Sequence, residues 1–322
     1  MKAAIISRPG ETPTYGDFSE PQPEAGENRI AVTAAAISQV VKSRASGRHY
    51  SSAGAFPFVV GIDGVGRTDD GRRVYFVLPQ APNGSMAERT VVSSAQCIAM
   101  PNDLDDVTAA AIANPGMSSW AAYTERARLK AGETVLVNGA TGTAGRLAVQ
   151  IARHLGAGKI IATARNADAL NSLAALGADV TIPLGDNDAG IESALKEQFA
   201  EGIDVVIDYL WGRSAELVLI AGTKAGRDAV PIRFVQVGAA SCEDIALPSA
   251  VLRSSAIALM GSGIGSVPVD HMLRAIDAML RATVPAGFQI RTTAVPLSEV
   301  ERAWSVDDSS RRTVFIVDAP TS

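Results

Sequence analysis

A glycine-spaced loop between a short apolar run and a helical segment is the feature that most constrains the fold of this chain. Residues 135–137 are Val-Leu-Val, residues 138–145 read NGATGTAG, and residues 146–157 repeat apolar side chains at helical spacing. A buried strand, a glycine-rich turn and a helix in this order form the phosphate-binding unit of nucleotide-binding α/β domains. Alternating strand and helix patterns follow the loop. The loop therefore predicts a parallel sheet with a cofactor site, rather than a mere tight turn.

The position of the loop predicts a second domain in front of it. The chain has 322 residues, more than one hydrophobic core usually supports. Residues 1–113 contain short strand-like runs, such as RIAVTAAAIS and AERTVVSS, between clusters of Gly, Pro and Asp. This pattern predicts an antiparallel, barrel-like β domain. A helical pattern, DDVTAAAIA, closes it and is expected to end near Asn114–Gly116.

From residue 114 to residue 265 the sequence alternates between strand and helix patterns. The strand candidates are TVLVN, KIIATA, DVTI, IDVVIDYL, RFVQVG and IALMG, and the helix candidates are RLAVQIARHLG, ADALNSLAALG and AGIESALKEQFA. Near-continuous apolar strands joined by helices indicate a doubly wound parallel sheet. Residues 266–322 hold one helix, two strands and a helical turn, which are too few elements for a domain of their own. We expect this last segment to return to the first domain.

Charge and cysteine content argue against several classes of function. The net charge is −5 and no basic stripe is present, so binding to nucleic acid is not expected. The N-terminal apolar run is too short for a signal peptide, and no run approaches the roughly 18 apolar residues of a membrane span. We therefore expect a cytoplasmic protein without a membrane segment. The two cysteines and three histidines show no metal-ligand spacing, which argues against a structural zinc site.

The residues of the loop have separate expected roles in binding a dinucleotide. Gly142 lets the backbone approach a pyrophosphate, and Gly145 lets the helix pack closely on the strand. Backbone N–H groups at Thr143 and Ala144, where the helix starts, are expected to bind the phosphates. Ala140 stands where this motif usually has its first glycine, which is tolerable if its φ stays negative.

The end of the second α/β strand predicts which dinucleotide is bound. NAD-selective domains place an acid there that binds the ribose 2′-hydroxyl, whereas this chain has Ala164 followed by Arg165. An acid would repel a 2′-phosphate, and a guanidinium binds one with two hydrogen bonds. We therefore predict NADPH, held by Arg165 and Asn166. In the alternative, Arg165 is an ordinary solvated residue and Asn166 caps the next helix. Gly238, after the fifth strand, is also assigned to the cofactor site.

Six segments carry a family resemblance: FPFVVGIDGVGR (56–67), DGRRVYF (70–76), GSMAERTVV (84–92), GMSSWAAY (116–123), LKAGETVLVNGATGTAG (129–145) and LGAD (176–179). Over nearly the whole chain, the sequence resembles the medium-chain dehydrogenase/reductase superfamily, and more narrowly its zinc-independent quinone oxidoreductase (zeta-crystallin-like) branch. The resemblance implies a GroES-like β-rich catalytic domain at 1–113 and a Rossmann NADP-binding domain at 114–265, with 266–322 returning to the catalytic domain. It also implies a homodimer that pairs through the strand around Ile257–Gly261.

The same resemblance argues against a catalytic zinc ion. Zinc alcohol dehydrogenases of this superfamily take zinc ligands from three places, which correspond here to Ser38, Ile62 and approximately Asn114. The hydrocarbon side chain of Ile62 cannot coordinate a metal, so these positions do not form a ligand set. We expect no metal site.

Hydride transfer without a metal favours acceptors that delocalise negative charge, namely quinones and α,β-unsaturated ketones or aldehydes. The resemblance implies Tyr50 as the hydrogen-bond donor to the developing oxyanion, with His49 or Ser38 as alternatives, and Ser118 near the nicotinamide. An ordinary loop role for Tyr50 stays open, as does a helix-capping role for Ser118. The predicted function is an NADPH-dependent quinone or enone oxidoreductase with a small-molecule acceptor. The alternatives are a zinc-free alcohol or carbonyl dehydrogenase and a low-turnover NADPH-binding protein of the zeta-crystallin type.

Overall fold

The structure, a computed structural model, describes residues 1–47, 56–185, 187–306 and 310–317. Contacts between residues divide the chain into two compact units. The first consists of residues 1–114 and 277–322, and the second of residues 115–276. The return to the first unit thus falls at residue 277, later in the chain than the expected position 266.

The second unit contains a six-stranded, fully parallel sheet, which confirms the predicted Rossmann architecture. Its strand order is β11-β10-β9-β12-β13-β14, the order in which doubly wound dinucleotide-binding sheets are built. The strands are β9 Thr134–Asn138, β10 Lys159–Ala164, β11 Val180–Pro183, β12 Val205–Asp208, β13 Ile232–Gln236 and β14 Ile257–Gly261. The order reverses between β9 and β12, and such sheets bind ligands outside the carboxyl ends of the strands at this point. β14 is the terminal strand, and its pairing in a homodimer stays a prediction.

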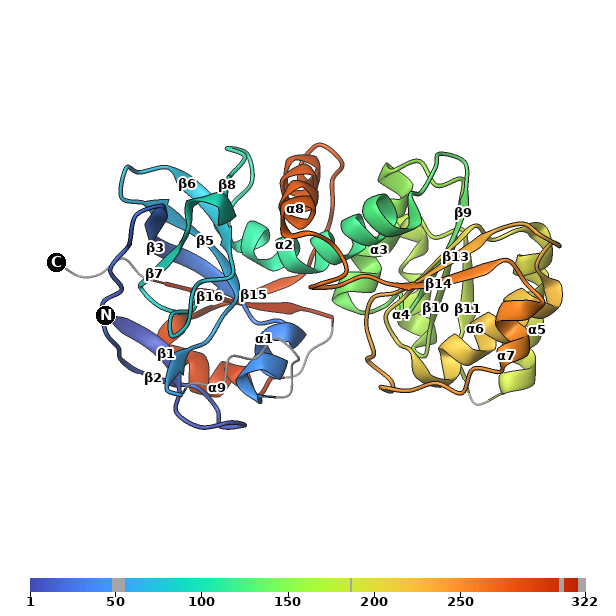
Figure 1. Ribbon diagram of the computed structural model, residues 1–322, viewed down its shortest axis with the longest axis horizontal. Coiled ribbons are helices and arrows are strands. Elements are labelled where there is room, and N and C mark those ends of the chain that lie inside the picture. Colours follow the sequence, from blue (N-terminus) through green and yellow to red (C-terminus); the bar gives the residue numbers. More distant parts are fainter. Residues whose placement is uncertain (48–55, 186, 307–309, 318–322) are drawn as a thin grey trace. The chain divides into compact units, whose positions relative to one another are not determined.

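Helices cover both faces of this sheet. α3 (Thr143–His154) lies on one face, and α5 (Asp188–Glu201) and α6 (Gly212–Ala225) lie on the other (Figure 1). Because both faces are buried, the central strand β12 is buried at every residue and reads as a nearly continuous apolar run. One core, which includes Phe199 and Phe234, joins the strands to α5 and α6.

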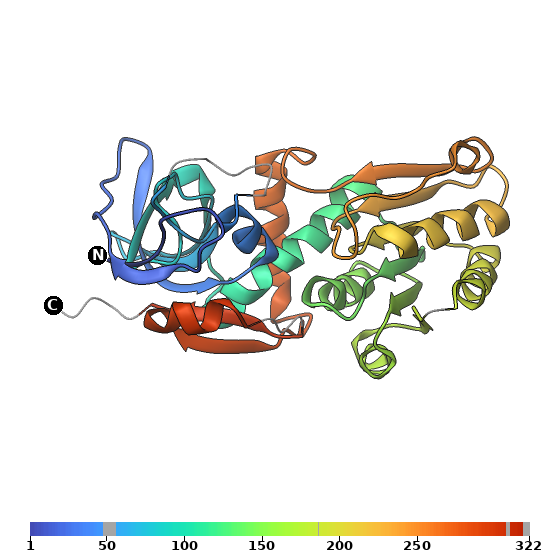
Figure 2. The same cartoon turned by 90° about the horizontal axis from the view of Figure 1, so that it is seen from below.

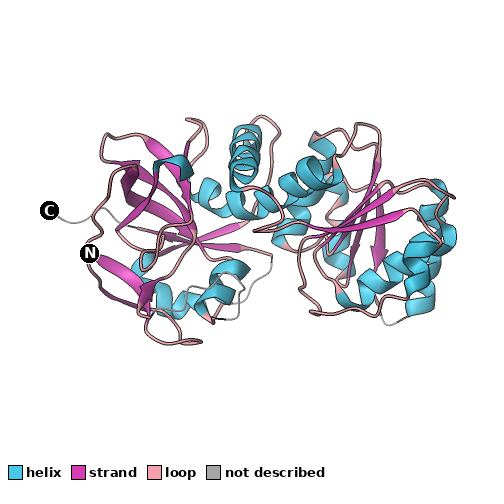
Figure 3. Cartoon of the chain, in the orientation of Figure 1, coloured by secondary structure: helices cyan, strands magenta, loops and turns pink. Residues whose placement is uncertain are grey.

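The first unit is built mainly from antiparallel strands, in agreement with the predicted β-rich domain (Figure 3). One sheet has the order β15-β16-β3-β5-β6-β8 with β7 paired to β3, and a smaller sheet has the order β2-β1-β4. The strands are β1 Lys2–Ile6, β2 Thr14–Asp17, β3 Glu27–Ala36, β4 Phe58–Val59, β5 Asp63–Thr68, β6 Arg73–Val77, β7 Arg89–Ser93, β8 Cys97–Ala99, β15 Thr292–Pro296 and β16 Arg312–Ile316. Figure 2 shows β15 and β16, in red, beside the blue strands that begin the chain. β16 belongs to the first sheet because it pairs antiparallel with β3.

The remaining helical elements are short, apart from α2 and α8. They are α1 Gln39–Ala45, η1 Ser94–Gln96, α2 Asp106–Ala121, η2 Ala122–Ala127, α4 Ala167–Asn171, η3 Ala174–Leu176, α7 Ser249–Arg253, α8 Val269–Thr283, η4 Leu297–Glu299 and α9 Val300–Trp304. The single helix predicted over ADALNSLAALG is thus two short pieces, α4 and η3. α6 was not among the predicted helices, although in the sequence it lies between two predicted strands, β12 and β13. Among the described residues, no helix has both the length and the apolar content that crossing a bilayer requires.

The helix predicted to end near Asn114–Gly116 does not end there. α2 continues through Pro115 to Ala121 and then into the π-helical turn η2. Proline removes a backbone donor and usually interrupts a helix. Here the hydroxyls of Ser118 and Ser119 both donate to the carbonyl oxygen of Pro115, over 2.8 and 3.2 Å. Burial of the helix, with Ile112 at 0% and Ala121 at 1% exposure on either side of the proline, overrides its local preference.

Candidate functional site

The glycine-spaced loop connects β9 to α3 at the point where the strand order reverses. Gly139 takes φ +90°, a conformation that favours glycine, and the N–H groups of Gly139 and Ala140 both donate to the carbonyl oxygen of Thr163, over 3.0 and 2.9 Å. Ala140 is absent from the described non-glycine residues with positive φ, so it meets the condition under which alanine is tolerated. The turn therefore depends on Gly139, a residue that the sequence reasoning did not select.

Gly142 and Gly145 leave the space that a dinucleotide loop needs. Gly142 is the N-cap of the 12-residue helix α3, with φ −70° and no side-chain cap. A Cβ atom on Gly145 would lie 2.2 Å from the carbonyl oxygen of Gly139 and 2.7 Å from the Cα atom of Ala140. The first turn of α3, which begins with Thr143 and Ala144, has no acidic residue, and the backbone N–H groups of a helix start point away from the helix. This end of α3 is therefore suited to bind a phosphate group.

The carboxyl end of β10 has no acidic residue. Ala164 is 2% exposed, and Arg165 is exposed with no hydrogen bond or ion pair to another described residue. Asn166 is the N-cap of α4, and its Oδ1 accepts from the N–H group of Ala169 over 2.9 Å. The capping role considered for Asn166 is therefore present, while the guanidinium of Arg165 is available to an anionic ligand.

A buried polar network beneath the loop was missed by the sequence reasoning. Asn138 Nδ2 donates to Asp208 Oδ1 over 2.7 Å and to Ser214 Oγ over 3.0 Å, and Thr163 Oγ1 donates to Asn138 Oδ1 over 2.6 Å. Burial raises the pKa of Asp208 to about 6, although hydrogen bonds from Leu210, Asn138 and Trp211 act to lower it. The available signal was a lone acid at the end of an apolar strand, in the run IDVVIDYL. The network ties the carboxyl ends of β9, β10 and β12 together.

The turn after β12 contacts the glycine loop directly. Trp211 has φ +57° and ψ −158°, an unfavourable conformation for a bulky residue, and its N–H group donates to the carboxylate of Asp208 over 3.1 Å. Leu210 packs on Gly139 so closely that a Cβ atom there would lie 2.9 Å from Leu210 Cγ. Gly238, assigned to the cofactor site, donates to the carbonyl oxygen of Asp208 over 3.2 Å. The structure thus brings Gly238 and the glycine loop to the same turn.

Ser118 lies inside α2, so it does not cap a helix. Its hydroxyl donates to the carbonyl oxygen of Pro115. The neighbouring Ser119 shares a 2.7 Å hydrogen bond with the hydroxyl of Tyr209, which is in the turn after β12. Ser119 therefore joins α2 to this turn, and the expected place of Ser118 near the nicotinamide stays a prediction.

Of the three catalytic candidates in the first unit, the structure describes only Ser38. His49 and Tyr50 lie outside the described residues. Ser38 is 3% exposed and is the N-cap of α1, where its Oγ accepts from the N–H group of Val41 over 3.1 Å. Ile62 is buried in the apolar core of this unit. Within the described ranges, no three His, Cys, Asp or Glu side chains gather in a way that suits a metal ion.

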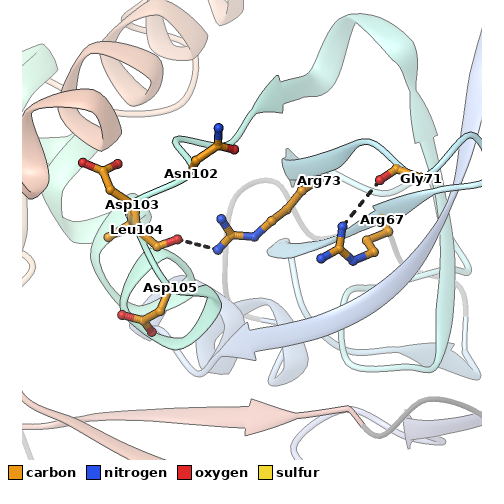
Figure 4. Close-up of a pocket in the computed structure, with 7 residues that line it drawn as sticks. All are labelled: Arg67, Gly71, Arg73, Asn102, Asp103, Leu104 and Asp105. Atoms are coloured by element: carbon orange, nitrogen blue, oxygen red, sulfur yellow. Dashed lines mark hydrogen bonds between the residues drawn. The ribbon is translucent and has the colours of Figure 1, made fainter.

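The described residues of the first unit line a larger and a smaller hollow. The larger, of about 630 Å³, is lined by Arg67, Arg73, Asp103 and Asp105 among others (Figure 4). Its arginines already have partners, because Arg67 donates to the carbonyl oxygen of Gly71 and Arg73 binds Asp106 and the carbonyl oxygen of Leu104. Its charges are balanced, so it favours neither an anion nor a cation.

The smaller hollow, of about 40 Å³, lies beside α1. Val41, Phe58, Val60 and Ile62 line it, together with Arg44. Its apolar side chains are accompanied by two polar ones, Arg44 and Asn83, and it lies in the same unit as the candidate Ser38.

Comparison with known proteins gives a consistent set of relatives. The family described as zinc-binding dehydrogenase matches residues 144–281. The protein named "Probable NADPH-dependent quinone reductase tdiC", from Emericella nidulans, is 30% identical over 363 aligned positions that cover 98% of this chain and 100% of the relative. The family match begins after Ser38, Ile62 and Asn114, so it does not include the three positions that correspond to zinc ligands.

Two solved structures share the fold. The quinone oxidoreductase of Thermus thermophilus, which was also solved as its NADPH complex, has a TM-score of 0.79 at 25% identity, covering 98% of this chain and 100% of that chain. An NAD-dependent alcohol dehydrogenase has a TM-score of 0.84 at 23% identity, covering 99% of this chain and 100% of that chain, and this likeness is one of fold alone.

Proposed function

Because this chain belongs to the quinone oxidoreductase branch of the medium-chain dehydrogenase/reductase superfamily, we propose that it is an NADPH-dependent reductase of quinones or α,β-unsaturated carbonyl compounds that works without zinc. The observation that carries the cofactor assignment is the carboxyl end of β10. There a buried alanine replaces the acid of NAD-selective domains, and the exposed Arg165 follows it.

The described residues suit this cofactor. The first turn of α3 would bind the diphosphate, with Gly142 allowing close approach and Gly145 holding the helix against the loop. Arg165 would bind the 2′-phosphate through its guanidinium. When bound, the nicotinamide supplies the hydride. The protein then has to orient the acceptor and stabilise the charge that develops on it.

Support for a conjugated acceptor comes from the residues at the positions of zinc ligands. The buried hydrocarbon side chain of Ile62 cannot bind a metal, and Ser38 is used as a helix cap. A protein without zinc at this place has to stabilise the oxyanion with hydrogen bonds alone, which is easier when a quinone or an enone spreads the charge. Tyr50 stays the proposed donor, and the alternatives are His49 and Ser38.

We expect NADPH oxidation with quinones and enones, and little with the matched saturated ketones. A saturated ketone concentrates the charge on one oxygen, whereas its conjugated counterpart delocalises it. The measurement is the loss of NADPH absorbance with pairs of acceptors, such as an enone and the ketone lacking its double bond. Equal rates within each pair would contradict the charge-delocalisation argument. If the main activity is oxidation of alcohols with NADP, the protein is a zinc-free alcohol dehydrogenase. If no acceptor is turned over, the protein binds NADPH without acting as an enzyme.

We also expect the purified protein to contain no stoichiometric zinc and to keep its activity in the presence of a chelator. The physical reason is that Ser38, Ile62 and Asn114 do not supply a zinc ligand set. Elemental analysis of the purified chain, together with turnover before and after chelation, makes the measurement. One tightly held zinc ion per chain would show that other residues bind the metal.

A further inference from the structure

The turn after β12 is held by a buried carboxylate that is surrounded by hydrogen-bond donors. Asp208, the last residue of β12, is 0% exposed. Its Oδ1 accepts from Asn138 Nδ2 over 2.7 Å and from the N–H group of Leu210 over 3.0 Å, and its Oδ2 accepts from the N–H group of Trp211 over 3.1 Å. An ionised carboxylate only accepts hydrogen bonds, so it matches all these partners, whereas a protonated one would bring a donor among donors.

This carboxylate binds the turn where its backbone is strained. Trp211 has φ +57° and ψ −158°, and Gly212, which follows it, has φ +58°. A bulky residue keeps such a conformation only where its surroundings fix it, and such residues cluster at functional sites. The N–H groups that Asp208 binds belong to Trp211 itself and to Leu210 before it. Asp208 therefore fixes the conformation of residues 209–212.

The same turn contacts both ends of the glycine loop. At the start of the loop, Leu210 packs so closely on Gly139 that a Cβ atom there would lie 2.9 Å from Leu210 Cγ. At its end, the hydroxyl of Tyr209 shares a 2.7 Å hydrogen bond with Ser119 Oγ, which lies 3.3 Å from the carbonyl oxygen of Ala144 in the first turn of α3. All these residues belong to the second unit.

The groups around Asp208 are neutral. Its neighbours on the adjacent strands are the amides Asn138 and Gln236, and Ser214 at the start of α6 is a hydroxyl. Burial raises the pKa of Tyr209 to about 12, so this phenol keeps its proton. Among the described residues, no cation forms an ion pair with Asp208. Hydrogen bonds alone therefore stabilise its charge.

We propose that Asp208, in its ionised form, holds residues 209–212 against both ends of the glycine loop, so that the affinity for the dinucleotide depends on this charge. Asp208 is then a positioning residue, because it acts on the cofactor through the turn and the loop. The inference rests on the cofactor site of the proposed function and not on which acceptor is reduced. Turnover with quinones and enones therefore tests the proposed function separately.

The titration of Asp208 gives the expected pH dependence its direction. Burial raises the pKa of Asp208 to about 6, while the hydrogen bonds from Leu210, Asn138 and Trp211 act to lower it. If the ionised form binds the dinucleotide more tightly, binding lowers this pKa further. The affinity is then full above about pH 7, and it falls as the pH decreases through about 6 and Asp208 takes up a proton.

The first test is calorimetric titration with NAD, which lacks the 2′-phosphate. That phosphate changes its own charge near pH 6 and would mask the effect in NADPH. Asp208→Asn removes the charge and keeps the shape of the side chain. Its Kd should exceed that of the wild type by about tenfold at pH 8, as expected for lost hydrogen bonds to a charged group, and by only about twofold at pH 5. A merely structural defect would raise Kd by the same factor at both pH values.

Proton release on binding is a second measurement. Titrations at pH 5.5 in two buffers with different ionisation enthalpies give the number of protons released per NAD bound. The wild type should release about half a proton, because binding shifts Asp208 toward its ionised form. Asp208→Asn should lack this release.

Two further variants separate Asp208 from other causes. Asp63, the first residue of β5 in the first unit, is also buried, and burial raises its pKa to about 6 as well. Asp63→Asn should keep the wild-type Kd for NAD and its pH dependence. Tyr209→Phe removes the hydroxyl that binds Ser119 and leaves the charge of Asp208, so its Kd should rise on the order of fivefold at both pH values.

A wild-type Kd that is equal at pH 5 and pH 8 would overturn this inference, as would a pH dependence that is lost in Asp63→Asn. An Asp208→Asn variant that differs from the wild type by one factor at all pH values would reduce Asp208 to a structural role and overturn it too. If Asp208→Asn does not fold, the wild-type profile and Tyr209→Phe decide, since wild-type affinity in Tyr209→Phe shows that the turn does not act on the loop. A wild type that shows the expected binding profile but reduces no quinone or enone would overturn the proposed function and support this inference.

Discussion

Replacing Gly145 by alanine should weaken NADPH binding by on the order of tenfold to a hundredfold and lower the melting temperature. The added Cβ atom would lie 2.2 Å from the carbonyl oxygen of Gly139 and 2.7 Å from the Cα atom of Ala140. Both neighbours are backbone atoms, so neither can turn aside as a flexible side chain would. Overpacking of this kind costs about 1–3 kcal/mol, and if the loop absorbs that strain, the affinity falls by about the stated factor.

Gly185→Ala is the control for this variant. Gly185 belongs to the same unit, its φ is not positive, and no heavy atom lies within 4 Å of the Cβ position. Fluorescence titration with NADPH and thermal unfolding of both variants make the comparison. A wild-type Kd in Gly145→Ala would show that the first turn of α3 does not need this close contact to bind the cofactor.

Arg165→Ala should remove most of the preference for NADPH over NADH. A lost charge-assisted hydrogen bond costs about 1.5–3 kcal/mol, or on the order of tenfold to a hundredfold in affinity. NADH has no 2′-phosphate, so its Kd should change little. Because Arg165 is exposed, the preference of the wild type should also weaken as salt screens the guanidinium.

The comparison needs four titrations, with NADPH and NADH against the wild type and the variant. Arg253→Ala, which removes another exposed arginine of the second unit, should keep the wild-type preference. Equal affinities for the two cofactors in the wild type would exclude Arg165 as the selecting residue. A loss of affinity for both cofactors in Arg165→Ala would instead point to a general effect on α4.

The parts of the fold that follow from local patterns were predictable from the sequence. The six parallel strands were found because the central ones, β9, β10 and β12, are almost wholly buried and all six read as apolar runs. α3 and α5 were found from their helical periodicity, and the glycine loop from its spacing. The condition placed on Ala140, a negative φ, is also a local property, and the structure meets it.

The errors arose where distant parts of the chain override a local preference. Pro115 predicted a helix end, yet α2 continues to Ala121 because burial of its side chains outweighs the local preference of the proline. Gly139 was overlooked because the motif directs attention to the glycines after it, while the positive φ falls on the residue before Ala140. The polar network around Asp208 joins residues that are 70 positions apart in the chain, which no periodicity reveals.

The sequence by itself determined the class of the protein: a Rossmann sheet preceded by a β-rich domain, a phosphate loop, and no acid at the ribose position. These features depend on residue types at short spacing, and short-range sterics and periodicity govern them. Only the tertiary structure decided which carboxylates are buried, and which backbone atoms lie so close to a glycine that no side chain fits there. Burial and hydrogen bonding depend on residues brought together from distant strands. The hydrogen bonds that join Asn138 to Asp208 and to Thr163 therefore became visible only when β9, β10 and β12 were placed in one sheet.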